Sequence, residues 1–497
     1  MRLIAILLFF SISVYAQYYV SPDGDDNNVG SISQPLKTIK KAFDKIKVSG
    51  DTIFLREGIY DQSVSLEPPV SGSEDQYKYL IAYENEHPVI DFIGQAYSSS
   101  NRGLKLTRDY WKIKGIEIKN AGDNGIHISG HYNIVENCSL HHNKDTGLQI
   151  SNGGSYNQII NCDSYLNYDP GTHGENADGF APKLDIGPGN YFKNCRAYLN
   201  SDDGWDCYEG QNQIIIDSCW AFHNGYNIWG DSSFQGDGNG FKLGGNYITA
   251  FHIIRNSIAF DNVSKGFDQN HNTGGITVYN CTGWRNGTNF SFNENPTDSV
   301  HILKNNLSFQ GSVNIASTSE MEKNSWNGFT VSANDFKSLD TSLATIARDE
   351  NFKLLQTDFL RLASASSLIN SGVDVGIPFL ETAPDLGAFE FDGISTSAKN
   401  ISAKTNEFNL NQNFPNPFNL STQINYSINK LSNIEISIYD VLGRRIKILF
   451  DGEKSAGEYR TFWNGIDENG DVVNSGVYFI ILKSSEYSIC RKIVLLK

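Results

Sequence analysis

The sequence predicts an all-β protein: a parallel β-helix closed at its N-terminal end by a short helix, followed by a small β-sandwich. The first observation is a glycine followed by a large apolar residue, which recurs at intervals of 22 to 36 residues. Self-similarity at this period, with short β-rich units, is typical of solenoids. The pairs are Gly125-Ile126, Gly147-Leu148, Gly179-Phe180, Gly204-Trp205, Gly240-Phe241 and Gly266-Phe267.

A second series of residue pairs runs in step with the first. The repeats lack the Leu-x-x-Leu-x-Leu frame of leucine-rich repeats and contain no helical pattern between strands, which leaves a parallel β-helix. The pairs of this second series are Asn137-Cys138, Asn161-Cys162, Asn194-Cys195, Ser218-Cys219, Asn256-Ser257, Asn280-Cys281 and Asn305-Asn306.

Stacking of the repeats turns this alignment into a spatial prediction. Equivalent positions of successive rungs lie about 4.8 Å apart. The residue after each glycine then forms an apolar column inside the coil, and the next residue points outward because side chains alternate along a strand. Lys242 is therefore expected one rung away from Asp206. The outward column reads His127, Gln149, Ala181, Asp206, Lys242 and Asp268.

Two adjacent rungs bring four carboxylates to one small patch, those of Asp178, Asp202, Asp203 and Asp206. Like charges this close repel unless a cation joins them. Oxygen donors without Cys or His favour a hard ion, so we predict a calcium site. Asp-Gly pairs are also ordinary turn formers. A turn would account for Asp178 and Asp203, but not for Asp202 or for the outward Asp206 beside a lysine.

These four acids and Lys242, with their spacings, resemble polysaccharide lyase family nine, and the resemblance covers roughly residues 17–392. It implies a right-handed parallel β-helix in which the four matching acids hold calcium. It also implies that the matching lysine, Lys242, abstracts the C5 proton of a galacturonate residue, so that pectate is cleaved by β-elimination. The family also contains lyases that act on rhamnogalacturonan, which is the alternative substrate.

The net charge of -16 argues against a nucleic-acid partner. A bound divalent cation together with Lys183, Lys242 and Lys265 would still attract an acidic polysaccharide to the groove. We expect Lys183, Lys265, Asp268 and His271 to contact the substrate, and we expect a monomer.

Two other classes of protein would share this fold. One is a non-catalytic β-helix that binds glycans or acts as an adhesin, which has no need of a base beside the acid cluster. The other is a β-helix glycoside hydrolase, which needs two carboxylates across the scissile bond and no lysine or metal. Lys242 beside the acids favours the lyase over both.

The N-terminal residues read as a secretory signal peptide over 1–16, with an apolar run after Met1-Arg2 and small residues before Gln17. The β-helix domain is then expected over 17–393. From Pro35 the apolar spacing is helical, with the proline suited to the first turn, and this short helix is expected to cap the solenoid.

A polar linker is expected over 394–408 and a β-sandwich over 409–497, where short alternating strands are separated by turns. Motifs such as Asn413-Phe414-Pro415-Asn416-Pro417 and Gly476-Val477-Tyr478-Phe479 are similar to C-terminal sorting domains of the type nine secretion system. The resemblance implies contact with secretion machinery, export, and attachment to the outer cell surface. A generic accessory β-domain is the alternative.

Seven cysteines in an exported protein would ordinarily suggest disulfides, but the count is odd and five occupy one ladder position. Stacked on neighbouring rungs, they are predicted to be buried thiols that pack as small apolar residues. Bridging of an adjacent pair is the alternative.

Overall fold

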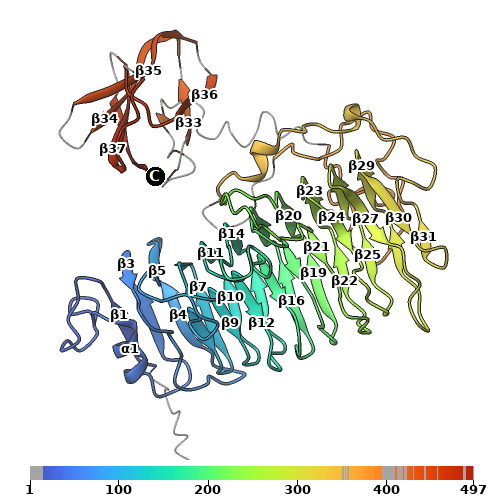
Figure 1. Ribbon diagram of the computed structural model, residues 1–497, viewed down its shortest axis with the longest axis horizontal. Helices are drawn as coiled ribbons and strands as arrows, with labels where there is room; N and C mark the ends of the chain where they lie inside the picture. Colours follow the sequence, from blue (N-terminus) through green and yellow to red (C-terminus); the bar gives the residue numbers. More distant parts are fainter. Residues whose placement is uncertain are drawn as a thin grey trace, which may run out of the picture. The chain divides into compact units, whose positions relative to one another are not determined.

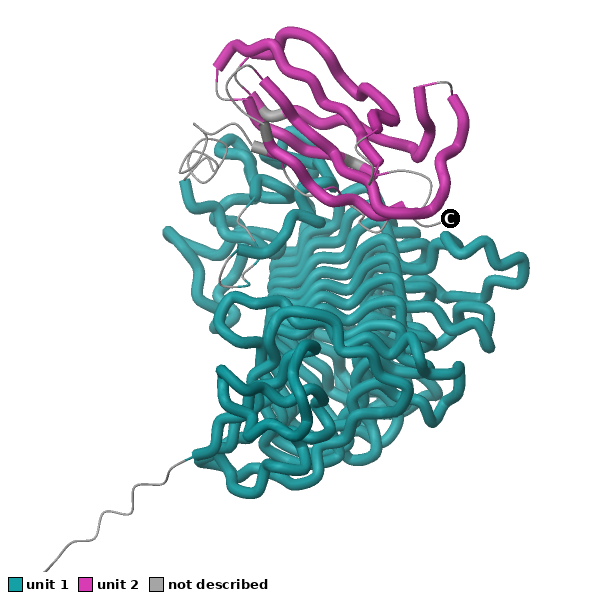
Figure 2. Tube along the Cα trace, turned by 90° about the vertical axis from the view of Figure 1, so that its left-hand side faces the viewer, with its two compact units in different colours: residues 1–394 teal, residues 395–497 magenta. Residues whose placement is uncertain are grey.

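The computed structural model describes residues 15–349, 352, 354, 357–393, 409–410, 413, 418, 422–428, 430–440, 444–455, 457–468, 470–484 and 488–495. The predicted signal peptide and linker fall largely or wholly outside these residues. The chain divides into two compact units, Met1–Ile394 and Ser395–Lys497 (Figure 2). Among the described residues, no helix has the length and apolar character needed to span a membrane.

The first unit is a parallel β-helix with three long parallel sheets, as predicted (Figure 1). Each rung contributes one short strand to each sheet, so strands that are neighbours in a sheet come from successive rungs. Sheet I comprises β1 (Gln17–Val20), β2 (Thr52–Leu55), β4 (Lys78–Ala82), β7 (Trp111–Lys114), β10 (Ile134–Glu136), β13 (Gln158–Ile160), β16 (Asn190–Lys193), β19 (Ile214–Asp217), β22 (Ile253–Arg255), β25 (Thr277–Tyr279), β28 (Ile302–Lys304) and β31 (Glu320–Glu322).

Sheets II and III complete each rung. Sheet II comprises β3 (Gly58–Asp61), β5 (Pro88–Asp91), β8 (Glu117–Lys119), β11 (Ser139–His141), β14 (Asp163–Tyr165), β17 (Arg196–Tyr198), β20 (Trp220–Phe222), β23 (Ile258–Phe260), β26 (Thr282–Trp284) and β29 (Leu307–Phe309). Sheet III comprises β6 (Leu104–Leu106), β9 (Ile126–Ile128), β12 (Leu148–Ile150), β15 (Phe180–Pro182), β18 (Trp205–Asp206), β21 (Phe241–Lys242), β24 (Lys265–Asp268), β27 (Thr288–Phe292) and β30 (Ser312–Ile315).

The glycine-apolar pairs mark sheet III, and their predicted stacking is confirmed. Leu148 pairs with Ile126 on one side and with Phe180 on the other, and Phe180 pairs in turn with Trp205. The column continues through Phe241 to Phe267. All six side chains are fully buried, so the repeat fills the inside of the coil with a continuous apolar stack.

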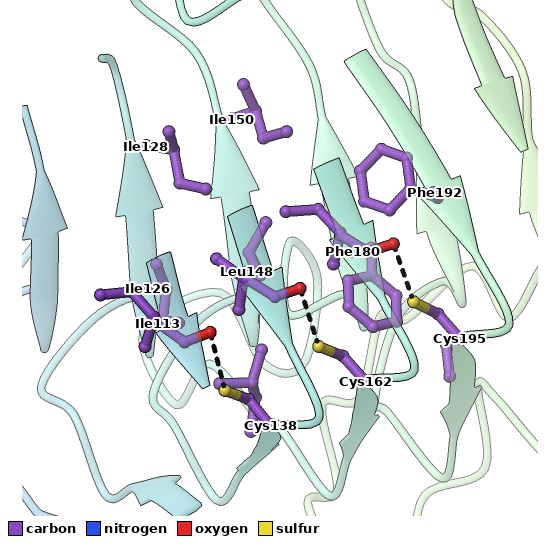
Figure 3. Close-up of a cluster of buried hydrophobic side chains, with 14 of the residues drawn as sticks. Ile113, Ile126, Ile128, Cys138, Leu148, Ile150, Cys162, Phe180, Phe192 and Cys195 are labelled. Carbon is purple, nitrogen blue, oxygen red and sulfur yellow. Dashed lines mark hydrogen bonds between the residues drawn. The ribbon is translucent and has the colours of Figure 1, made fainter. Parts of the chain in front are cut away.

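The six cysteines of the first unit are buried, Cys490 of the second unit is exposed, and all seven are free. The Sγ atoms of Cys138, Cys162 and Cys195 contact the carbonyl oxygens of Ile113, Val135 and Ile159 at 3.9, 3.5 and 3.4 Å. Figure 3 shows these three thiols among buried Ile, Leu and Phe side chains. The ladder cysteines therefore pack as small buried residues, and no adjacent pair is bridged.

The N-terminal cap is the helix α1 (Ile39–Lys45), and it begins later than expected. Thr38 is the N-cap, and its side chain accepts a hydrogen bond from the backbone N–H of Lys41. Pro35 therefore lies before the helix, not in its first turn, because the Thr38 hydroxyl satisfies the helix N-terminus three residues later. Ile39, Ala42 and Phe43 bury their side chains against the first rungs.

After the last rung, the chain forms two short 3₁₀ helices, Ala333–Asp335 and Thr341–Ala344. Side chains of this segment, including Phe336, Phe359 and Leu362, pack against the outer face of sheet II, on Trp220 and Phe260. A buried ion-pair network ties the segment to the rungs: Arg348 and Arg196 both contact Asp163, each at 2.6 Å.

The second unit consists of two antiparallel sheets around a shared apolar core, as predicted for a small β-sandwich. Trp463, Ile436 and Ile480 are fully buried in this core. One sheet comprises β32 (Asn409–Leu410), β33 (Thr422–Ile428) and β36 (Gly457–Trp463). The other comprises β34 (Ser432–Asp440), β35 (Arg445–Lys454), β37 (Gly476–Ser484) and β38 (Ser488–Leu495).

Candidate active site

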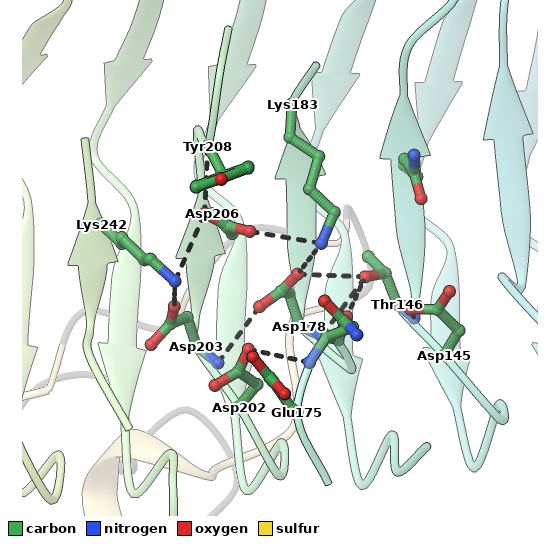
Figure 4. A network of polar contacts seen from close by, with 12 residues as sticks. Asp145, Thr146, Glu175, Asp178, Lys183, Asp202, Asp203, Asp206, Tyr208 and Lys242 are labelled. Atoms are coloured by element: carbon green, nitrogen blue, oxygen red, sulfur yellow. Dashed lines mark hydrogen bonds and ion pairs between the residues drawn. The ribbon is translucent and has the colours of Figure 1, made fainter. Parts of the chain in front are cut away.

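The candidate site lies on sheet III, at β15, β18 and β21 (Figure 4). Asp206 pairs directly with Lys242 across β18 and β21, as the repeat predicts. Asp178, Asp202 and Asp203 lie in the turns that lead into β15 and β18. The site is therefore assembled from three successive rungs, and its side chains share the outer face of one sheet.

A ladder of buried asparagines fixes the turns that carry these acids. The Nδ2 atom of Asn167 donates to Oδ1 of Asn200 at 2.8 Å, and Nδ2 of Asn200 donates to Oδ1 of Asn224 at 3.1 Å. Asn200 lies two residues before Asp202. The two repeat series described above do not include this ladder. Its signal is nevertheless present in the sequence as one asparagine per rung, namely Asn143, Asn167, Asn200, Asn224, Asn262 and Asn286.

Asp178, Asp202 and Asp203 form a compact acid cluster. One carboxylate oxygen from each lies within 4.8 Å of the others, and all three side chains are buried. We call these three residues the acid trio. Their donors are oxygen atoms only, and the spacing is compatible with a single cation held between them.

Backbone N–H groups and polar side chains orient the trio. Oδ1 of Asp178 accepts from the backbone N–H of Asp203, and its Oδ2 accepts from the Thr146 hydroxyl at 3.2 Å. Oδ1 of Asp203 accepts from the backbone N–H of Asn239 and from its Nδ2, at 2.6 and 2.9 Å. Oδ2 of Asp203 is buried and accepts no hydrogen bond of good geometry, and its near neighbour is the ammonium group of Lys242, with Nζ at 3.2 Å.

The electrostatics of the trio are those of crowded anions. Burial raises the pKa of Asp178 to about 7, with Lys183 opposing the rise and Asp206 adding to it. Burial likewise raises the pKa of Asp203 to about 8, against the effect of Lys242. The pKa of Asp202 lies well above its ordinary value, because of burial and the charge of Asp203. A divalent cation would relieve this repulsion.

Asp206, the fourth predicted ligand, lies beside the trio but outside the group whose oxygens lie within 4.8 Å of one another. Its Oδ2 lies 3.2 Å from Nζ of Lys183, and its Oδ1 accepts from the backbone N–H of Tyr208 at 3.0 Å. Lys183, expected to bind substrate, also lies 2.9 Å from Oδ2 of Asp178, and its side chain is buried. The structure thus places Lys183 between two predicted metal ligands.

Lys242 lies at the edge of the trio. Its Nζ is 3.2 Å from Oδ2 of Asp203, 3.9 Å from Oδ1 of Asp206 and 3.0 Å from Oδ2 of Asp237. Burial lowers the pKa of Lys242, but the charges of Asp203 and the neighbouring acids outweigh burial and raise it. After Asp203, the charges that raise this pKa are those of Asp206, Asp202 and Asp237.

The remaining predicted residues lie on the next rung. Lys265 pairs with Asp268 at 2.8 Å, and Asp268 is adjacent to Lys242 in the register of β21 and β24. His271 extends further, with half of its side chain exposed, and its Nδ1 lies 2.5 Å from Glu294. These three residues continue the polar surface of sheet III beyond Lys242.

Two insertions in the repeat, residues 168–176 before β15 and residues 226–239 before β21, contact each other. The Tyr168 hydroxyl donates to Oδ2 of Asp231 at 2.6 Å, and the rings of Tyr168 and Trp229 stack with centroids 4.9 Å apart. Both insertions also reach the trio: Oδ2 of Asp202 accepts from the backbone N–H of Asn176, and Oδ1 accepts from that of Asp237. The aromatic side chains therefore serve to join the loops.

A family model described as the right-handed β-helix region of Pel9A-like proteins matches residues 18–306. The chain belongs to this family. Pectate lyase L of Dickeya dadantii is 44% identical over 390 residues, which cover 76% of this chain and 91% of that protein. The family assignment identifies a polysaccharide lyase and decides against the non-catalytic and hydrolase alternatives.

Solved structures agree with this assignment. The crystal structure of pectate lyase Pel9A is 43% identical, with a TM-score of 0.72, over 76% of this chain and 97% of that one. A rhamnogalacturonan lyase is 28% identical, with a TM-score of 0.63, over 70% of this chain and 97% of that one. A second family model, of secretion system C-terminal sorting domains, matches residues 412–496 and identifies an exported protein.

Proposed function

We propose that this protein is a calcium-dependent pectate lyase in which Lys242 is the base of a β-elimination. The observation that carries the proposal is the position of Lys242 Nζ, 3.2 Å from Asp203 at the edge of a buried cluster of oxygen ligands. A cation site and a basic side chain on one sheet face are the two groups that elimination next to a carboxylate requires.

The acid trio fits calcium by the chemistry of its donors. Three buried carboxylates contribute only oxygen atoms, and these oxygens lie within 4.8 Å of one another. Hard cations such as calcium take oxygen ligands, whereas zinc and copper sites draw on Cys and His. We assign Asp178, Asp202 and Asp203 as calcium ligands. Asp206, whose Oδ2 lies 3.2 Å from Nζ of Lys183, is assigned as the fourth ligand.

Calcium, when bound, would supply positive charge that offsets these carboxylates and attracts the carboxylate of a uronate. The chain's own residues would do the rest. Neutral Lys242 Nζ takes the C5 proton, the electron pair forms the C4–C5 double bond, and the C4–O4 bond breaks. The departing O4 takes a proton from water. Lys242 projects from the outer face of sheet III beside the proposed ligands Asp203 and Asp206, and we expect a polymer lying along the rungs to reach its Nζ there.

The substrate proposal is drawn from the relatives. Those at 44% and 43% identity are pectate lyases, so polygalacturonate is the first substrate to test. The rhamnogalacturonan lyase is more distant at 28% identity, so rhamnogalacturonan is the second. Incubation with each polymer and calcium should generate the ultraviolet absorbance of an unsaturated uronate only with the true substrate. New reducing ends without this absorbance would mean hydrolysis and would overturn the proposal.

Two variants separate the cation site from the base. Asp203→Ala should weaken calcium binding, measured by titration calorimetry, because one buried ligand is lost. Lys242→Ala should keep the fold and the calcium affinity while turnover collapses, and Lys242→Arg should fail too because guanidinium stays protonated. Full activity in excess chelator, or near-normal turnover of either Lys242 variant, would contradict the mechanism.

A further inference from the structure

Asp237 lies at the end of the second insertion, five residues before Lys242. Its carboxylate oxygen Oδ2 accepts a hydrogen bond from Lys242 Nζ at 3.0 Å, the shortest contact that Nζ makes with a carboxylate. The Asp237 side chain is 55% exposed, whereas the side chains of Asp203 and Asp206 are almost fully buried. Lys242 therefore has acids on its buried side and a single acid on its solvent side among the described residues.

The backbone at Asp237 is fixed independently of its side chain. Its N–H donates to Oδ1 of Asp202 at 2.6 Å, and two residues later Asn239 donates twice to Asp203. This end of the insertion is thus attached directly to the acid trio. A change at the Asp237 side chain would leave these backbone contacts in place.

A cation held at the proposed site would engage the other acids near Lys242. Asp203 and Asp206 belong to the ligand set proposed above, so Asp237 is the neighbouring carboxylate that remains available to the amine. Lysine has four rotatable side-chain bonds, and a mobile Nζ spends little time in one place. A hydrogen bond from the solvent side opposes collapse of Nζ onto Asp203.

We propose that Asp237 is a positioning residue, which holds Lys242 Nζ at the groove surface in reach of the substrate. This inference rests on the proposed function, in which Lys242 is the base. Misplacing a reacting group by about 1 Å can lower a rate by about 100-fold. If the contact were only an exposed ion pair, its loss would cost about 0 to 1 kcal/mol of stability and nothing in turnover.

The test compares four variants of the full chain: Asp237→Ala, Asp237→Asn, Lys242→Ala and the control Glu320→Ala. Glu320 forms a comparable exposed pair with Lys304 on sheet I, with side chains 52% and 18% exposed. Asp237→Ala should lower kcat by about 10- to 100-fold, with KM and calcium affinity within about threefold of the unaltered protein. Asp237→Asn keeps a hydrogen-bond acceptor and should stay within about threefold in kcat. Glu320→Ala should leave kcat, KM and calcium affinity unchanged.

The outcomes are distinguishable. Normal kcat in Asp237→Ala, equal impairment of the Ala and Asn variants, or a loss confined to calcium affinity or KM would overturn the positioning role. If Lys242→Ala itself remains active, the proposed function fails first. An inactive Lys242→Ala with a normal Asp237→Ala overturns only the present inference.

Discussion

Nζ of Lys183 lies 2.9 Å from Oδ2 of Asp178, and the Lys183 side chain is only 10% exposed. Burial lowers the pKa of Lys183, but Asp178 and Asp206 outweigh burial and raise it well above its ordinary value. Lys183 is therefore a fixed positive charge that balances two predicted calcium ligands. The contact with substrate that the sequence suggests for Lys183 stays a prediction.

Replacing Lys183 by Met should destabilise the calcium-free protein by about 3 to 5 kcal/mol, because buried carboxylates lose their counter-charge. Saturating calcium should reduce this loss. Urea unfolding with chelator and with calcium measures both values. The control is Lys265→Met, whose pair with Asp268 is more exposed and should cost about 0 to 1 kcal/mol. Equal losses of unfolding free energy in the two variants would show that Lys183 is no more important for stability than an exposed ion-pair lysine.

Calcium affinity should rise with pH. Burial raises the pKa of Asp178 to about 7 and that of Asp203 to about 8, so both carboxylates bind protons near neutrality in the free protein. A cation competes with these protons and binds more tightly once they leave. Titration calorimetry between about pH 6 and 9 should show increasing affinity and proton release on binding. A pH-independent affinity would mean that the trio is already ionised.

Turnover should have an alkaline optimum. Lys242 acts as a base only when it is neutral, and the surrounding acids raise its pKa above the ordinary value of about 10.4. The neutral fraction, and hence kcat/KM at saturating calcium, should increase up to tenfold per pH unit on the acid side of that pKa. Rates measured from about pH 7 to 10 test this. A profile that falls across this range would remove Lys242 as the base.

Asp163 should control stability in acid. Burial raises the pKa of Asp163, but Arg196 and Arg348 outweigh burial and hold it below its ordinary value. Its stabilising effect is present above the unfolded pKa of about 3.9 and is lost as pH falls toward the folded pKa. Asp163→Asn should cost about 3 to 5 kcal/mol at neutral pH and should flatten the loss of stability below about pH 4. An unchanged acid profile would contradict this.

A chain that ends at Gly393 should remain folded and active. The site residues and the cores of the β-helix lie within Met1–Ile394, and the sandwich has an apolar core of its own. Rung-to-rung contacts are local, so they do not require the second unit. Circular dichroism and the elimination assay, compared with the full chain, measure the outcome. Loss of activity in a folded, shortened chain would show that the sandwich contributes to catalysis.

The sequence by itself determined the rungs and their register. A glycine followed by a large apolar residue recurs once per turn, and a one-residue shift would expose the apolar column, so few alignments are possible. That register was enough to pair Asp206 with Lys242 and to gather Asp178, Asp202 and Asp203. It also placed the ladder cysteines inside the coil, because they follow the same period.

Only the tertiary structure decided what surrounds these residues. Asp237 comes from an insertion without a repeat, so no alignment could place its carboxylate 3.0 Å from Lys242. The sequence did not show that the long side chain of Lys183 lies between Asp178 and Asp206, where it is the counter-charge of two buried acids. Periodicity fixes backbone positions along a solenoid. The conformations of insertions and of long charged side chains depend instead on contacts with residues distant in the sequence and on nearby charges.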